Sequence, residues 1–244
     1  MWTARRPVPC LFAALLAPAL LLLSLPALAQ PVAPYHLWWA EDLVTHVDPA
    51  NNAYGTSPSY VRWAGVAGAT QYENRSLCTT FVTILLKQAY GWTDSQIRVW
   101  LGSGSPNATM YHDNIEQEDG FVRIMKAAHI EAGDLLAIKY PAGLSVTGHL
   151  ATARGEAILR EATAPIIADT VQYEVEIVDS SSTGHGPDDT RLKSDGTWHP
   201  GAGFGVMRVY ADAAGDLVGY TWSTVAASMY YGLATRHLVV GRLE

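Results

Sequence analysis

The sequence predicts an α+β fold in which helices come first and an antiparallel sheet follows. Up to Leu101 the apolar residues recur mainly at helical spacing, whereas after Gly120 short apolar or alternating runs are separated by turn residues. Helices followed by a run of strands are typical of α+β domains. The chain has no internal repeat, low-complexity tract or linker, so we expect one domain over residues 30–244.

Three helices are expected in the first half of the chain. The clearest spans 78–89 and is stopped by Gly91; its apolar positions recur at helical spacing (Phe81, Ile84, Leu85 and Ala89). A short helix is expected near 38–45 and another over 93–101. The segment between the first two helices, up to Tyr72, is rich in aromatic and turn residues and is expected to form loops.

The expected sheet follows from short runs bounded by turn residues. These runs are 135–140, 148–153, 173–179, 204–210, 217–221 and 236–243. The run 173–179 alternates, which places Asp179 on the same face as Val175 and Ile177. Residues 157–163 are expected to form a loop or a short edge strand. Residues 180–203 form a long polar loop, and loops of that length are often functional.

The first 29 residues have the features of a secretory signal peptide. Arg5 and Arg6 precede an apolar run over 11–27, and Ala27-Leu28-Ala29 provides a small-x-small cleavage pattern. The alternative is a membrane anchor, but the apolar core is short and is interrupted by prolines. We therefore expect an exported protein, periplasmic or secreted, with a mature domain over 30–244 and no stable membrane anchor.

The composition favours a packed globular domain and excludes some classes of partner. Hydrophobic residues make up 49% of the chain, which includes 8 Trp and 12 Tyr. The formal net charge is −7 and becomes −9 when Arg5 and Arg6 are removed. Because the chain has no basic footprint, we expect neither nucleic acid nor an anionic membrane surface as a partner.

Cys78 is the one cysteine that the mature chain is expected to keep, because Cys10 lies in the leader. A single thiol cannot form an internal disulfide, and an unpaired cysteine in an exported protein indicates a reactive thiol. Cys78 opens the expected helix 78–89, where backbone N–H groups and the helix dipole favour a thiolate. The alternative is a buried structural cysteine.

His149 and Asp179 are the candidate partners of Cys78. A nucleophilic cysteine needs a base to accept its proton and a third group to orient that base. His149 opens the strand 148–153 directly after a turn, and Asp179 ends the following clear strand. If the two strands are neighbours, the Asp179 carboxylate reaches the far ring nitrogen of His149 and fixes its tautomer.

Three segments resemble the NlpC-type bacterial cysteine peptidases of the papain-like superfamily, which also includes the CHAP amidases. The segment around Leu77-Cys78-Thr79-Thr80 resembles the nucleophile segment, Gly133-Asp134-Leu135 the start of the first core strand, and Gly148-His149-Leu150 the histidine strand. Asp179 takes the place of the third polar residue, which in the family is often His. The chain departs from the family at Leu77, where Asp is usual, and at Thr79-Thr80, where Ser-Gly is usual.

The resemblance implies a papain-like fold, with the nucleophile at a helix N-terminus packed on an antiparallel sheet, and a cysteine hydrolase. Cys78 would attack an amide carbonyl, His149 would act as base and then acid, and Asp179 would orient His149. A thioester would form and be hydrolysed by water. The implied partner is a peptide or another amide or ester substrate, first of all a peptidoglycan stem peptide. No cofactor and no metal is required.

Three alternatives remain open at this stage. The first is an inactive secreted module of the same fold that binds wall glycan or peptide. The second is a metal site in the long loop, made by acidic and imidazole side chains that suit zinc or calcium (His185, Asp188, Asp189 and His199). The third concerns Arg191, which either clamps a substrate carboxylate or forms a surface ion pair with Asp188 or Asp189.

Overall fold

The computed structural model describes residues 34–244, which form four α-helices and twelve strands. The helices are α1 (Tyr35–His46), α2 (Cys78–Tyr90), α3 (Asp94–Leu101) and α4 (Ala108–Glu116), with 3-10 turns η1 (Pro49–Asn51) and η2 (Ala127–His129). The strands are β1 (Asn52–Tyr54), β2 (Tyr60–Arg62), β3 (Glu73–Ser76), β4 (Phe121–Arg123), β5 (Leu135–Lys139), β6 (Gly148–Ala153), β7 (Ile158–Arg160), β8 (Val171–Ser181), β9 (Gly201–Ala211), β10 (Leu217–Thr221), β11 (Tyr230–Gly232) and β12 (His237–Leu243). The expected signal peptide, residues 1–29, lies outside the described residues.

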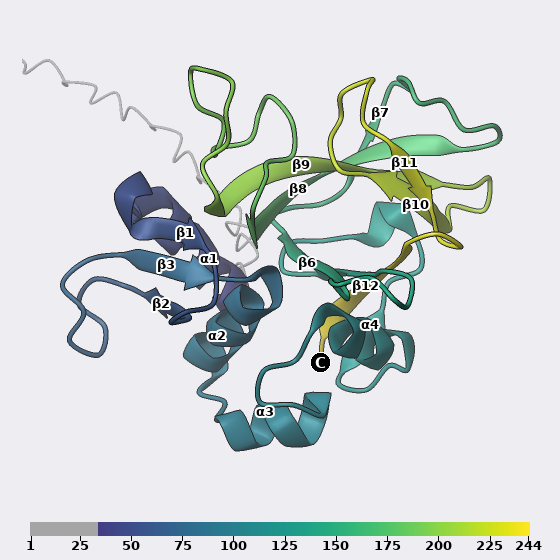
Figure 1. Cartoon of the computed structure of the whole chain (residues 1–244). Helices are drawn as coiled ribbons and strands as arrows, with labels where there is room; N and C mark the ends of the chain where they lie inside the picture. Colours follow the sequence, from purple (N-terminus) through teal and green to yellow (C-terminus); the bar gives the residue numbers. More distant parts are fainter. Residues whose placement is uncertain (1–33) are drawn as a thin grey trace, which may run out of the picture. The chain divides into compact units, whose positions relative to one another are not determined.

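The strands form one large and one small sheet. The large sheet has nine strands in the order β11-β10-β9-β8-β6-β5-β12-β4, with β7 paired to β8, and the pairings between these strands are antiparallel. The small sheet has the order β1-β3-β2 and lies beside α1 and α2 (Figure 1). The described part of the chain is therefore an α+β domain, as the order of helices and strands predicts.

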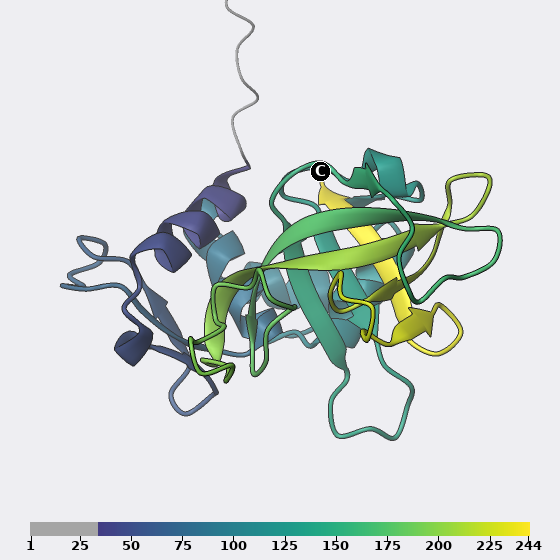
Figure 2. The same ribbon diagram turned by 90° about the horizontal axis from the view of Figure 1, so that it is seen from above.

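Two hydrophobic cores lie on opposite faces of the large sheet. Helices α1, α2 and α4 pack against one face, where alternate strand residues such as Ala137, Leu150 and Val239 are buried. The residues between them, such as Ile138 and Ala151, point into a second core, which the sheet itself encloses. Figure 2 shows the long strands β8 and β9 running side by side across the molecule, at a steep angle to β12. The sheet is therefore strongly coiled, and strands from both of its halves contribute to the second core.

The clearest expected elements are confirmed with small shifts of their ends. Helix α2 begins at Cys78, ends at Tyr90 and is followed by Gly91, whose φ of 71° is the left-handed conformation that glycine adopts most easily. Helix α3 follows Thr93, which forms a capping box with Gln96. Strand β6 has the expected bounds, β7 is the short edge strand, and β8 is longer than expected by two residues at each end.

Some expectations were incomplete or wrong. The segment before Tyr72 contains the short strands β1 and β2 instead of loops alone, and the sequence pattern missed β3, β4, β11 and α4. Helix α4 buries Ala108, Tyr111, His112 and Ile115. Because His112 is polar, the buried face of this helix cannot be recognised from the spacing of apolar residues. The missed strands have three or four residues each, too few for alternation to be recognised.

Candidate active site

Cys78 is the first residue of α2 and is buried, with 6% of its surface exposed. Strand β3 leads directly into this position and is fixed by hydrogen bonds to other elements. The Ser180 hydroxyl of β8 donates to the Ser76 carbonyl, at 2.9 Å, and Asn74 donates to the side chain of Asn52, at 2.8 Å. Asn52 in turn donates to the Ala202 carbonyl of β9. These buried contacts hold the start of α2 against the end of the large sheet.

The structure brings His149 and Asp179 together, as expected for neighbouring strands. Strands β6 and β8 pair with Thr152 opposite Val178, and His149 Nε2 lies 2.6 Å from Asp179 Oδ2. His149 follows Gly148, whose φ is 151°, and a Cβ at Gly148 would collide with the Ile138 carbonyl oxygen. Glycine is therefore required directly before His149 for β6 to pair with β5 at this point.

The Cys78 thiol lies among three groups that interact with its sulfur. Burial alone would raise the pKa of Cys78, but the charge and hydrogen bond of His149 and the backbone N–H of Leu150 lower it overall. The Tyr54 hydroxyl also hydrogen-bonds to the thiol, and burial raises the pKa of Tyr54, so this hydroxyl keeps its proton at neutral pH. These groups favour the thiolate form of Cys78.

His149 carries the complementary charge. Burial would lower its pKa, but the charge of Cys78 and the hydrogen bonds to Asp179 and Cys78 raise the pKa to about 10. Because Nε2 is bonded to Asp179, the other ring nitrogen, Nδ1, is the one left for Cys78. The arrangement therefore favours a thiolate beside an imidazolium.

Asp179 is completely buried and is surrounded by positive groups. Burial would raise its pKa, but Arg191, His185 and the hydrogen bond from His149 hold the pKa well below its ordinary value. Arg191 Nη1 lies 2.8 Å from Asp179 Oδ1, and His185 Nε2 lies 2.9 Å from Asp179 Oδ2. The Asp179 carboxylate is therefore ionised, and two side chains of the long loop, one at each carboxylate oxygen, hold it in place.

His185 and Arg191 come from the loop between β8 and β9, and Asp189 connects them. Asp189 accepts hydrogen bonds from the His185 backbone N–H at 2.8 Å and from Arg191 Nη2 at 2.7 Å. Arg191 is only 3% exposed. The expected ion pair of Arg191 with Asp189 is present, but it is buried and not at the surface. The expected clamp on a substrate carboxylate is not found, because the guanidinium already pairs with Asp179 and Asp189.

The two ring nitrogens of His185 both face acceptors. Nε2 meets the Asp179 carboxylate, and Nδ1 lies 2.9 Å from the Trp222 carbonyl oxygen. The ring is therefore held between a carboxylate and a backbone carbonyl. The sequence pattern indicates His185 only as a polar residue of the long loop and a ligand of the alternative metal site, without its contact to Asp179.

The metal site expected as an alternative in this loop is not formed by the described residues. His185 and Asp189 belong to the network around Asp179, while His199 faces the Pro49 carbonyl and Asp188 is exposed. A different group, His149, Asp179 and His185, is close enough to hold an ion. However, the converging atoms are already at hydrogen-bond distance from one another, with His149 Nε2 and His185 Nε2 both on Asp179 Oδ2, and Arg191 adds a positive charge beside the carboxylate, which favours acid–base chemistry over metal binding.

A pocket of about 290 Å³ opens beside His149. Its lining is aromatic and polar and contains no carboxylate or lysine (Tyr54, Tyr140, Val146, Gly148, His149, Ser181–His185 and Trp222). Trp222 packs edge-on against His149, with the ring centroids 5.2 Å apart, and so closes one side of the imidazole. Besides the two imidazoles, the walls offer aromatic faces and hydroxyl groups, which suit a substrate with an amide or ester carbonyl.

The chain is similar to the uncharacterized protein R653 of Acanthamoeba polyphaga mimivirus. The two are 29% identical over 221 residues, which cover 86% of this chain and 97% of R653. No family model matches the chain, and no solved structure matches it significantly. The fold and the site define an α+β protein with a buried Cys–His–Asp constellation.

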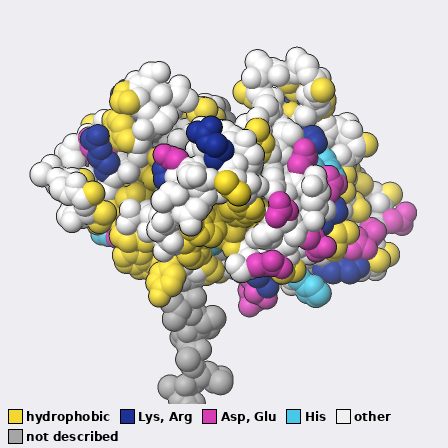
Figure 3. Space-filling view, turned by 90° about the horizontal axis from the view of Figure 1, so that it is seen from below, with side chains coloured by type: hydrophobic (Ala, Val, Ile, Leu, Met, Phe, Trp, Pro, Cys, Tyr) yellow, Lys and Arg dark blue, Asp and Glu magenta, His cyan; other side chains and the backbone are white. Residues whose placement is uncertain are grey.

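The described surface gives two further observations. None of the helices in residues 34–244 is long and apolar enough to cross a membrane. On the face drawn in Figure 3, Lys and Arg side chains are scattered among Asp and Glu instead of gathering in one patch. This face therefore offers no continuous basic surface.

Proposed function

We propose that the protein is a cysteine hydrolase of the papain-like, NlpC-type class that cleaves an amide bond through a thioester. The observation that carries the proposal is the position of His149 between the Cys78 thiol and the buried Asp179 carboxylate. A nucleophile, a base and a group that orients the base are the minimum for this chemistry. The helix-first order of the chain and the strand that carries His149 support the same class.

In this mechanism the Cys78 thiolate attacks the substrate carbonyl carbon and a tetrahedral oxyanion forms. The His149 imidazolium then donates its proton to the leaving amine, and the C–N bond breaks to leave a thioester on Cys78. Neutral His149 next removes a proton from water, whose oxygen attacks the thioester and releases the acid and the thiolate. Asp179 keeps the ring of His149 oriented through Nε2 in each step.

Two groups are placed to stabilise the oxyanion. Cys78 is the first residue of α2, and its preceding residue, Leu77, provides no side-chain cap, so backbone N–H groups of the first turn remain available. The Tyr54 hydroxyl lies beside the sulfur and keeps its proton. The loss of the usual Asp at the position of Leu77 is compatible with this role.

The substrate class that we propose first is a peptide, with a cell-wall stem peptide as the leading example if the predicted signal peptide exports the protein. The pocket supports a neutral amide because its walls are aromatic and hydroxylic. An ester would fit the same three groups, so substrate panels have to contain both bonds.

The pH dependence of iodoacetamide labelling at Cys78 tests the proposal. In a Cys10→Ser background of the full-length protein, labelling of the folded state should persist well below pH 8.5, the ordinary pKa of a thiol. His149→Ala should move the labelling profile upward toward that value, because the thiolate loses its counter-ion. Peptide mapping by mass spectrometry confirms the labelled residue, and intact unfolding curves confirm that both variants are folded.

Labelling only above pH 8, or only after unfolding, would contradict the proposal. It would leave Cys78 a structural residue and make an inactive binding module of the same fold the better explanation. If labelling behaves as expected, turnover of muropeptides, unrelated peptides and aryl esters identifies the bond. Turnover should fall as the pH rises through about 10, because His149 then loses the proton that the leaving group needs.

Tyr54→Phe tests the second oxyanion donor. We expect kcat to fall about 100-fold with little change in KM, as for the removal of one oxyanion-hole donor. Tyr140→Phe is the matched control, since Tyr140 lines the same pocket and, unlike Tyr54, forms no hydrogen bond to the thiol. Equal changes of kcat in the two variants would show that Tyr54 does not stabilise the oxyanion and only lines the pocket.

A further inference from the structure

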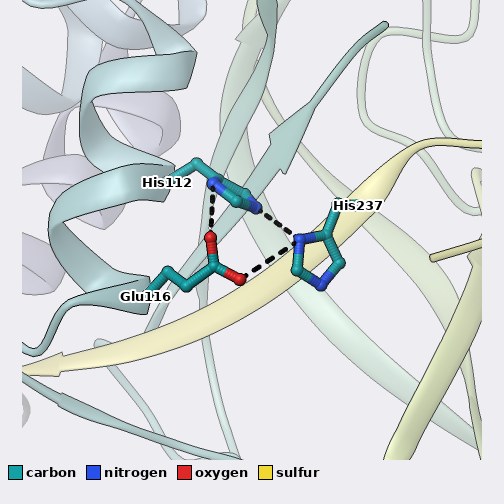
Figure 4. A group of neighbouring side chains, drawn as sticks. All are labelled: His112, Glu116 and His237. Atoms are coloured by element: carbon teal, nitrogen blue, oxygen red, sulfur yellow. Dashed lines mark hydrogen bonds and ion pairs between the residues drawn. The ribbon is translucent and has the colours of Figure 1, made fainter. Parts of the chain in front are cut away.

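A second cluster of ionisable side chains lies apart from the proposed active site, between α4 and β12. It consists of His112, Glu116 and His237, which Figure 4 shows converging on one point. His112 and Glu116 are one turn apart on α4 and so share a face, and His237 is the first residue of β12. One ligand atom from each residue lies within 4.8 Å of the others.

We propose that His112, Glu116 and His237 form a binding site for a divalent transition metal, with Zn²⁺ as the best match. Two imidazoles and one carboxylate are a donor set that zinc uses, and the fourth position of such sites holds water. His112 Nε2 and His237 Nδ1 are 3.0 Å apart. Two nitrogens on a tetrahedral zinc are about 3.3 Å apart, given Zn–N distances near 2.0–2.1 Å, so a shift of a few tenths of an ångström admits the ion.

The surroundings of His112 prepare its Nε2 as a ligand. His112 is buried, with 1% of its side chain exposed, and its Nδ1 lies 2.8 Å from the Asp113 carboxylate. Donation of the Nδ1 proton to Asp113 leaves the lone pair on Nε2, which faces His237. A carboxylate behind the far nitrogen of a ligating histidine is the usual partner in zinc sites. Lys139, 2.7 Å from the same oxygen of Asp113, fixes that carboxylate in turn.

The other two proposed ligands, Glu116 and His237, are partly exposed, so an ion can reach the site from solvent. The side chains of Glu116 and His237 are 41% and 30% exposed. Arg123 is the one cation beside Glu116 in the described chain, and its Nη2 is 3.9 Å away, a long contact at the surface that a metal can replace. Glu116 Oε1 is 3.6 Å from His237 Nδ1 and Glu116 Oε2 is 3.9 Å from His112 Nδ1, so the carboxylate lies beside both imidazoles.

The proposed metal site is separate from the Cys78 site. His237 pairs with Lys139, and Lys139 pairs with Gly148, so His237 is on the helix-covered face of the sheet. His149 follows Gly148 and therefore points to the opposite face. The proposal does not rest on the proposed hydrolase activity, and an unreactive Cys78 would leave it unchanged. A metal here would join α4 to the C-terminal strand.

Metal titration of the chelator-treated full-length protein tests the proposal. We expect one equivalent of Co²⁺ to give the visible absorption of a tetrahedral site. Zn²⁺ at a concentration 100-fold above its Kd should raise the Tm by roughly 5–10 °C. His237→Ala should lose both effects, and because His237 is partly exposed this variant should fold without metal. His129→Ala is the matched control, since His129 is an exposed histidine outside the cluster.

His149→Ala separates the two clusters, because His149, Asp179 and His185 are also close together. Retention of the Co²⁺ spectrum and the Tm shift in His149→Ala, with their loss in His237→Ala, supports the proposal. Absence of Co²⁺ or Zn²⁺ binding to the wild-type protein would overturn it. Equal binding by His237→Ala and the wild type, or loss in His149→Ala alone, would overturn it as well.

Discussion

Replacing Cys78 by Ala is expected to abolish turnover, with a fall in kcat of about 10⁴-fold or more. The Cys78 sulfur forms the covalent bond to the acyl group in the thioester intermediate, and the described residues contain no other cysteine that could replace it. Cys78→Ser should be nearly as inactive, because a serine hydroxyl is a much weaker acid than a thiol and does not lose its proton to the His149 imidazole. Turnover of the substrate found in the panel, measured at saturating concentration, gives the comparison.

The Tm separates a catalytic role of Cys78 from a packing role. Cys78→Ser keeps the size and shape of the side chain, so its Tm should remain close to that of the wild type. Cys10→Ser serves as the control for cysteine removal in general and should retain full activity. A large loss of stability in both Cys78 variants, with part of the turnover retained, would contradict the nucleophilic role.

Replacing Arg191 by Met is expected to cause the largest loss of stability. The substitution removes the cation between two carboxylates that are fully buried, and one unpaired buried charge costs about 3–5 kcal/mol. For a domain of this size, that corresponds to a fall in Tm of roughly 6–20 °C. Arg62→Ala is the matched control, since its pair with Glu73 is more than half exposed on the arginine side and should change the free energy of unfolding by less than about 1 kcal/mol.

The pH dependence of unfolding gives Arg191→Met a second readout. The pKa of Asp179 is held below its ordinary value, so its contribution to stability is full above the unfolded pKa and is lost as the pH falls through the folded pKa. Without Arg191 the folded pKa rises, and acid unfolding should begin at a higher pH. A variant as acid-resistant as the wild type would show that His149 and His185 suffice to keep Asp179 ionised.

Much of the candidate site could be predicted from local sequence. Cys78 begins the most regular helical pattern of the chain, and Gly148-His149 follows a turn and opens an apolar strand. Asp179 falls on one face of an alternating run. Each of these positions is set by periodicity over a few neighbours, so no knowledge of distant contacts was needed. His149 and Asp179 come into contact because β6 and β8 are paired strands in the structure.

The remaining site residues could not be predicted because they depend on contacts between distant segments. Tyr54 lies on a three-residue strand whose pairing with β3 places it beside Cys78. His185 and Arg191 lie in a loop without periodicity, and they reach Asp179 because the loop folds back on β8 and β9. His112 and His237 are 125 positions apart and meet only where α4 packs on β12.

The sequence by itself determined the α+β class, the main helices and strands, and the three residues of the proposed catalytic group. Apolar spacing and turn residues act over short stretches, and a single chain contains them in full. Only the tertiary structure decided which charges surround Asp179, which hydroxyl faces Cys78, and that a second imidazole cluster exists. Those outcomes depend on strand register and on how a long loop packs, because a buried charge is stable only where distant partners compensate its loss of water.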